Sequence, residues 1–123
     1  MTESEMMKAD WVKFVTTERD MFLFTYAGYW MRGVKHDADL GWLVWEGDGD
    51  IPFDTEPNRD IALDVWPTEE NLPVDWYRIN KVLAEEAWDI GVDKYGEFWY
   101  DEGDADMYDN VLQLALLGEI RYG

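Results

Sequence analysis

Apolar residues recur at helical spacing near both ends of the chain. Residues 3–16 carry apolar side chains three and four positions apart, and the Thr-Glu-Ser-Glu pattern at their start is a capping box that predicts a helix. Near the other end, a helix is predicted with Asp104 or Asp106 as its N-cap. Asp109 then falls in the first turn, where a carboxylate meets unpaired N–H groups, and Gly118 ends the helix.

A third helix is predicted in the middle of the chain, from Pro73 to Gly91. Proline favours the first position of a helix and glycine commonly follows the last. The apolar residues of this segment repeat at helical spacing and would form its inward side: Trp76, Ile79, Leu83, Ala87 and Ile90.

Two other segments have the pattern of strands. Gly41–Glu46 is a short apolar run, and Asp60–Trp66 alternates aliphatic residues with others. We expect these two segments to pair across the turn-rich residues 47–59. Met21–Trp30 is apolar and aromatic throughout, so it is either a buried strand or an apolar helix that ends at Gly33.

Length and composition indicate one folded unit. The 123 residues fit a single compact domain, residues 1–123, and 47% hydrophobic with 16% aromatic residues is not the composition of a disordered acidic tail. The expected fold class is α+β, helix-dominated, with a small central sheet or hairpin, and an all-α bundle is the alternative. Most of the tryptophans are expected in the core: Trp30, Trp42, Trp45, Trp66, Trp76, Trp88 and Trp99.

The net charge belongs to the later part of the chain. Residues 1–35 hold five acids and five bases, whereas residues 36–123 hold 23 acids and five bases, which gives the formal net charge of −18. Two tracts, residues 36–58 and residues 95–120, contain seven acids each and no lysine or arginine. Because such a chain repels itself, we expect the acidity to serve a binding surface.

Carboxylates that a folded protein holds in fixed positions can occupy a groove that binds the phosphates of a nucleic acid. In its size, single domain, lack of cysteine and acidity, the chain resembles the DNA-mimic proteins that phages and mobile elements use against restriction and CRISPR systems. The resemblance implies a non-enzymatic inhibitor whose partner is a basic nucleic-acid-binding protein of a host defence complex, with no direct binding of nucleic acid. The two acidic tracts supply the expected partner-binding residues: Asp37, Asp39, Glu46, Asp48, Asp50, Asp54, Glu56, Glu97, Asp101, Glu102, Asp104, Asp106 and Asp109.

Other interpretations stay open. The acidity alone can keep an aromatic-rich domain soluble, in an ordinary or a salty cytoplasm. The protein would then be a protein–protein interaction module, in phage or bacterium, that binds through an aromatic patch. Aromatic residues between acidic neighbours are candidates for this patch, although Trp99 is favoured as core: Tyr95, Phe98, Trp99 and Tyr100. Exposed aromatic residues also permit a two-fold homodimer.

Residues typical of catalysis or metal binding are scarce. Cysteine is absent, and the one histidine, His36, is interpreted as a surface turn residue. Asp48, Asp50 and Asp54 offer a calcium site as an alternative to an Asp-Gly turn, but Ile51 stands where a calcium loop requires glycine. We therefore expect no enzyme activity, no cofactor and no metal.

The expected location is the cytoplasm of a bacterial host. The first residues lack the basic and apolar pattern of a signal peptide, and no apolar run reaches the roughly 18 to 20 residues that span a bilayer. An anionic membrane surface is also a poor partner for a chain with a pI near 4.1.

Overall fold

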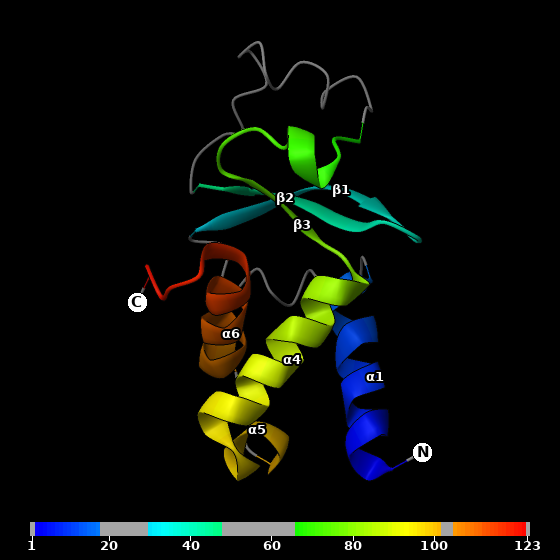
Figure 1. Cartoon of the computed structure of the whole chain (residues 1–123), viewed down its shortest axis with the longest axis vertical. Coiled ribbons are helices and arrows are strands. Elements are labelled where there is room, and N and C mark those ends of the chain that lie inside the picture. Colours follow the sequence, from blue (N-terminus) through cyan, green and yellow to red (C-terminus); the bar gives the residue numbers. More distant parts are fainter. Residues whose placement is uncertain (1, 18–29, 48–65, 102–104, 123) are drawn as a thin grey trace.

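A small antiparallel sheet lies across the ends of three long helices (Figure 1). This computed structural model of the chain describes residues 2–17, 30–47, 66–101 and 105–122. The architecture is helix-dominated α+β with a sheet built from the middle of the chain, as the sequence predicts.

The two helices predicted near the ends of the chain are present. Helix α1 spans Glu3–Thr16, and the Thr2 hydroxyl caps it by accepting a hydrogen bond from the Glu5 N–H at 3.1 Å. Helix α6 spans Ala105–Leu117. It ends at Gly118, whose φ of +79° lies in the left-handed region that glycine tolerates.

The start of α6 differs from the prediction in detail. Asp106 lies inside the first turn of the helix and is therefore not its N-cap. Asp109 is four residues beyond the first helical residue, so it falls in the second turn because a turn holds 3.6 residues. Asp104, the other predicted N-cap, lies outside the described residues.

The predicted helix Pro73–Gly91 is wrong at both ends: its first part is not helical, and the helix continues past Gly91, which is buried inside it. Strand β3 occupies Trp76–Ile79, and helix α4 spans Lys81–Tyr95. Asn80 separates the two elements because its side-chain oxygen accepts a hydrogen bond from the Leu83 N–H at 2.9 Å. An asparagine N-cap starts a helix and prevents it from extending backwards. A short helix, α5, which was not predicted, follows α4 over residues 97–101.

The sheet has the strand order β1-β2-β3, with all neighbours antiparallel. Strand β1 is Met31–Asp37. Strand β2 is Gly41–Glu46, which confirms the strand predicted for these residues. The predicted pairing of β2 with Asp60–Trp66 is wrong, because β1 occupies one edge of β2 and β3 the other. Residues 60–65 lie outside the described residues, and Trp66 belongs to no helix or strand.

The segment Met21–Trp30 lies outside the described residues except for Trp30, which is in a turn. The next residues, including Gly33, belong to β1, so no helix ends at Gly33.

Both faces of the sheet are covered. Alternate side chains of the three strands join the main core with the helices: Met31, Trp42, Val44, Tyr77 and Ile79. The opposite face packs against the segment before β3, which contains the 3-10 turn η2 (Glu69–Asn71), and forms a second cluster: Val34, Leu43, Trp45, Trp66, Leu72 and Trp76. Because both faces of the sheet are buried, the sequence of β2 is a continuous apolar run.

The C-terminal end of α1 is fixed to the sheet. His36 Nε2 lies 2.6 Å from the carbonyl oxygen of Thr16, and the Trp42 indole N–H donates to the carbonyl oxygen of Thr17 at 3.2 Å. The His36 and Trp42 rings are also in contact, with centroids 4.9 Å apart. His36 is therefore a half-buried strand residue, and its interpretation as a surface turn residue is wrong.

Tryptophan dominates the core, as the composition predicts. Three of the predicted core tryptophans, Trp42, Trp45 and Trp66, are only half-buried. Trp11, which was not among them, is buried with four that were: Trp30, Trp76, Trp88 and Trp99.

Candidate functional site

Six of the thirteen predicted partner-binding carboxylates have described side chains: Asp37, Asp39, Glu46, Glu97, Asp106 and Asp109. The backbone of Asp101 belongs to α5, but its side chain is outside the description. The other six lie wholly outside the described residues: Asp48, Asp50, Asp54, Glu56, Glu102 and Asp104.

Glu46 is used inside the fold. Its side chain is only 8% exposed, and it accepts hydrogen bonds from the hydroxyl groups of Tyr77 and Tyr122. Arg121 Nη1 lies 3.2 Å from Glu46 Oε2. Burial raises the pKa of the Glu46 carboxyl, but the two tyrosine hydrogen bonds and the charge of Arg121 outweigh it and hold that pKa below 4.5. Burial and the bond to Glu46 raise the pKa of Tyr77 to about 12.

The lowered pKa of Glu46 makes its contribution to stability depend on pH. That contribution is complete above the unfolded pKa near 4.5 and is lost as the pH falls through the lower folded pKa. We therefore expect Glu46→Gln to be less stable than the wild type near neutral pH, and the difference to shrink as the pH falls. Urea unfolding from about pH 6 to about pH 2 measures it.

Asp39→Asn is the control for this measurement, because Asp39 is exposed in the turn between β1 and β2. It should follow the wild type within about 0.5 kcal/mol over the whole range. A Glu46→Gln deficit that stays constant with pH would contradict the assignment.

Asp109 is also held by the fold. Its Oδ1 accepts hydrogen bonds from the Trp30 indole N–H at 2.7 Å and from Gln113 Nε2 at 3.2 Å. Gln113 is fully buried; its side-chain oxygen accepts from the backbone N–H groups of Arg121 and Tyr122, both at 2.8 Å, and its Nε2 donates to the Tyr122 carbonyl oxygen. Neither Glu46 nor Asp109 therefore adds a freely presented charge to the surface.

The other four described candidates are on the surface or near it. Asp37 Oδ1 accepts hydrogen bonds from the N–H groups of Asp39 and Leu40, so it shapes the turn after β1. Asp39, Glu97 and Asp106 are exposed. The structure does not bring these four together, since they belong to the β1–β2 turn, α5 and the start of α6.

Most exposed carboxylates of the described surface were not among the predicted residues. Thirteen aspartates and glutamates are exposed there, against four lysines and arginines. Four of the thirteen lie on the first turn of α1, the last turn of α4 and α5, which meet at the end of the molecule farthest from the sheet (Figure 1). We call this set the acidic end: Glu3, Glu5, Asp93 and Glu97.

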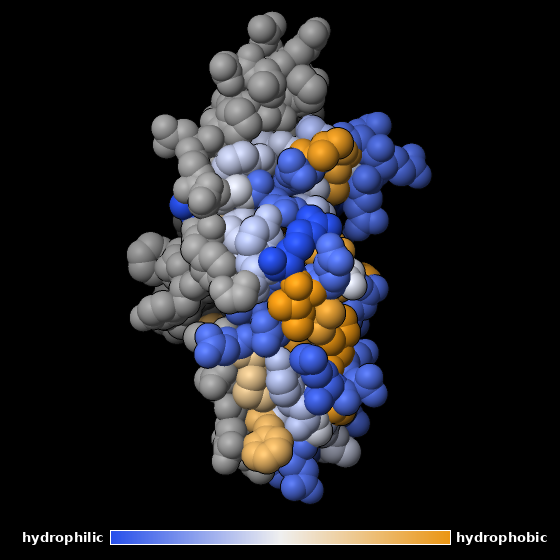
Figure 2. Space-filling model, turned by 90° about the vertical axis from the view of Figure 1, so that its left-hand side faces the viewer, coloured by the Kyte–Doolittle hydropathy of each residue, from blue (hydrophilic) through white to orange (hydrophobic). Residues whose placement is uncertain are grey.

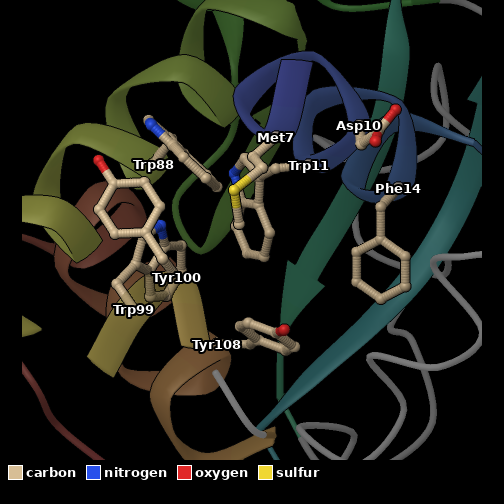
Figure 3. A pocket seen from close by; sticks show the side chains of 8 residues that line it. All are labelled: Met7, Asp10, Trp11, Phe14, Trp88, Trp99, Tyr100 and Tyr108. Carbon is tan, nitrogen blue, oxygen red and sulfur yellow. The ribbon is translucent and has the colours of Figure 1, made fainter. Parts of the chain in front are cut away.

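One face of α1 borders an aromatic cavity of about 450 Å³. Met7, Asp10, Trp11 and Phe14 are three and four residues apart, and such residues share one side of a helix. Figure 3 shows these side chains along α1, with further rings facing them from α4, α5 and α6. The rings on that side come from four residues: Trp88, Trp99, Tyr100 and Tyr108.

The rings of this cavity hold one another in place. The centroid of Trp11 lies 5.1 Å from that of Trp99 and 5.2 Å from that of Tyr108, and Trp99 and Tyr108 meet edge to face at 86°. Such contacts are worth about 0.5–1.5 kcal/mol each beyond the buried area. Trp88 stands edge-on to Trp99 and Tyr100. Each of these rings therefore packs against at least one other ring of the cavity.

Trp99 is the centre of this arrangement. It is 4% exposed, and its ring lies so close to Gly91 that a Cβ at position 91 would be 2.4 Å from it. Trp99 is confirmed as core, whereas its neighbour Phe98 is 62% exposed. Within the described part of the chain, the Trp99 indole N–H has no hydrogen-bond acceptor.

A second cavity adjoins the first. It has a volume of about 470 Å³ and shares Met7 and Tyr100 with the aromatic cavity. Thr2, Glu3 and Ser4 complete its lining. Among the described residues, the lining of each cavity contains one carboxylate and no lysine, arginine or histidine.

No three histidine, aspartate or glutamate side chains of the described ranges are grouped so that they could hold a metal ion. The alternative calcium ligands, Asp48, Asp50 and Asp54, lie outside those ranges. None of the described helices has the length and apolar character that crossing a bilayer requires.

Comparison of the chain with protein-family models, with curated proteins and with solved structures found no match. The functional argument therefore rests on the residues themselves.

Proposed function

We propose that this protein is a non-enzymatic inhibitor that presents a negatively charged, DNA-mimicking surface to the nucleic-acid-binding site of a basic host defence protein. The observation that carries the proposal is the excess of thirteen exposed carboxylates over four exposed cations on the described surface. A basic groove that binds DNA attracts any surface of this charge over long range. The restriction or CRISPR class of target comes from the resemblance of the chain in size and acidity to known DNA mimics.

Helices hold some of these carboxylates at spacings that suit a phosphate-binding groove. Glu86, Asp89 and Asp93 are exposed on α4, three and four residues apart. With a rise of about 1.5 Å per residue, they are separated along the helix axis by roughly 4.5 and 6 Å. One DNA strand presents a phosphate about every 3.4 Å along its axis, so the carboxylates are one to two phosphate steps apart.

Salt bridges neutralise little of this surface. Lys8 Nζ lies 3.1 Å from Asp89 Oδ1, and Arg121 pairs with Glu119 and Glu46. The pairs of Asp89 and Glu119 are exposed and worth about 0–1 kcal/mol each, so a partner's basic groups can compete for these two carboxylates. The acidic end has no salt bridge within the described residues.

A specific observation favours the second candidate function, a protein–protein interaction module. Phe98 is 62% exposed beside the aromatic cavity residues Trp99 and Tyr100. Figure 2 shows an apolar area, surrounded by hydrophilic residues, on the side of the molecule that carries α6. Docking through aromatic and apolar contacts would depend little on salt, whereas charge mimicry would weaken steeply with salt.

The test is capture of partners from a bacterial lysate on the immobilised chain, followed by elution with duplex DNA. The main eluted protein is then purified, and its affinity for the chain is measured at about 0.05 M and about 0.2 M salt. We expect a nucleic-acid-binding protein whose affinity falls at least about tenfold over this range. The chain should also displace DNA from that protein.

Two triple variants locate the binding surface. Glu5→Gln, Asp93→Asn and Glu97→Gln together remove three of the four negative charges of the acidic end, and we expect about a tenfold loss of affinity. Asp39→Asn, Glu69→Gln and Glu70→Gln remove the same charge from exposed positions near the sheet and should cost less. Partners that DNA does not elute, or that bind equally well at both salt concentrations, would contradict mimicry and favour the interaction module.

A further inference from the structure

We propose that the aromatic cavity between α1 and helices α4 to α6 is a receptor for an arginine side chain of the partner protein. The identity of the partner rests on the proposed function, but the chemistry of the cavity is independent of it. Its volume of about 450 Å³ lies within the range of pockets that enclose small ligand groups.

The walls of the cavity suit a flat organic cation. Six of its eight lining residues are aromatic, and the faces of tryptophan and tyrosine attract cations through their negative π-clouds. A guanidinium group is planar and only weakly hydrated, so it stacks on such rings more readily than the ammonium group of lysine. The rings already support one another, as shown by the 5.1 Å contact of Trp11 with Trp99, so little order has to be created on binding.

The charges at the cavity select a cation over a neutral or anionic ligand. Among the described residues, Asp10 is the one charged residue of the lining; it is exposed, and none of them forms an ion pair with it. Glu3 lines the adjoining cavity, with Met7 and Tyr100 between the two. A carboxylate beside an aromatic wall offers a guanidinium both hydrogen-bond acceptors and a stacking surface.

Lys8, the lysine that precedes Asp10 on α1, does not compete for this site. Lys8 points to α4, where its ammonium group lies 3.1 Å from the carboxylate of Asp89. Asp10 thus has no salt bridge to another described residue, and the net charge of −18 makes a basic protein the partner of matching chemistry.

The experiment uses the full chain and two matched probes, N-acetyl-arginine amide and N-acetyl-citrulline amide. Citrulline has nearly the shape of arginine but is uncharged. The indole N–H resonances of the eight tryptophans are followed by two-dimensional NMR at millimolar probe concentrations. We expect the arginine probe to shift the resonances of Trp11, Trp88 and Trp99, and to leave that of Trp76, on the other face of the sheet, in place.

Substitution of the rim carboxylate tests the charge. Asp10→Asn should weaken binding of the arginine probe about three- to tenfold, whereas Asp39→Asn, with the same change of charge in the β1–β2 turn, should not. The proposal is overturned if citrulline shifts the same resonances equally, if neither probe shifts them, or if the two variants behave alike.

These outcomes separate the cavity from the proposed function. If the arginine probe binds but DNA releases no partner from the chain, the cavity stands and DNA mimicry fails. If DNA releases a partner whose affinity is unchanged by Asp10→Asn, and the probe does not bind, mimicry stands and the arginine site is refuted.

Discussion

Replacing Trp99 with alanine should lower the free energy of unfolding by about 3–5 kcal/mol, the range for removing a buried tryptophan or phenylalanine side chain. Trp99 is 4% exposed and contacts the rings of Trp11, Trp88 and Tyr108. The substitution removes this buried area and leaves a void where four helices meet. Urea unfolding followed by circular dichroism measures the loss.

The next residue back in the sequence provides the matched control. Phe98 belongs to the same short helix, α5, but is 62% exposed, so Phe98→Ala should change the unfolding free energy by no more than about 0.5 kcal/mol. Similar losses from the two substitutions would show that α5 does not pack as described.

The second large effect is expected at Gln113. Gln113→Leu keeps an apolar side chain of similar size in the core, but it deprives the backbone N–H groups of Arg121 and Tyr122 of their acceptor. It also removes the donor to the Tyr122 carbonyl oxygen. These three hydrogen bonds are only part-buried, so each should contribute about 1 kcal/mol, and we expect a total loss of about 2–4 kcal/mol.

Deleting the backbone groups that Gln113 binds distinguishes the loss of these hydrogen bonds from an effect of Gln113→Leu on core packing. In a chain shortened after Gly118, residues 121 and 122 are absent, so Gln113→Leu should cost much less than in the full chain. The comparison is a double-mutant cycle. An equal cost in both chains would mean that Gln113 does not act by binding the tail.

Local sequence signals predicted several elements correctly. The capping box at Thr2 and the periodic apolar residues after it specified α1, and Gly118 specified the end of α6. β2 was predicted because burial on both faces makes it apolar throughout. Each of these signals lies within the element itself, which is why the sequence alone sufficed.

The errors arose where the pattern of one element continued by chance into another. Trp76 and Ile79 stand at helical spacing from Leu83, yet they point to opposite faces of the sheet, one into each apolar cluster. The N-cap Asn80 was the local signal that could have placed the helix start correctly. β1 was missed because only its first residue, Met31, is buried, which leaves no clear alternation.

The candidate site was predictable only in part. The spacing of Met7, Trp11 and Phe14 indicates one apolar side of α1, but not that rings from α4, α5 and α6 would face it. Likewise the acidic tracts do not reveal that Glu46 and Asp109 are used inside the fold, because their partners are far away in the sequence. Long-range contacts decide which charges reach the surface.

The contact of Gly91 with Trp99 constrains how this sequence can diverge. A Cβ at position 91 would be 2.4 Å from the indole ring, and real Cβ contacts are never so short. A descendant chain with the same fold can therefore gain a side chain at position 91 only if position 99 changes to a smaller residue as well. In an alignment of true homologues, these two columns should vary together.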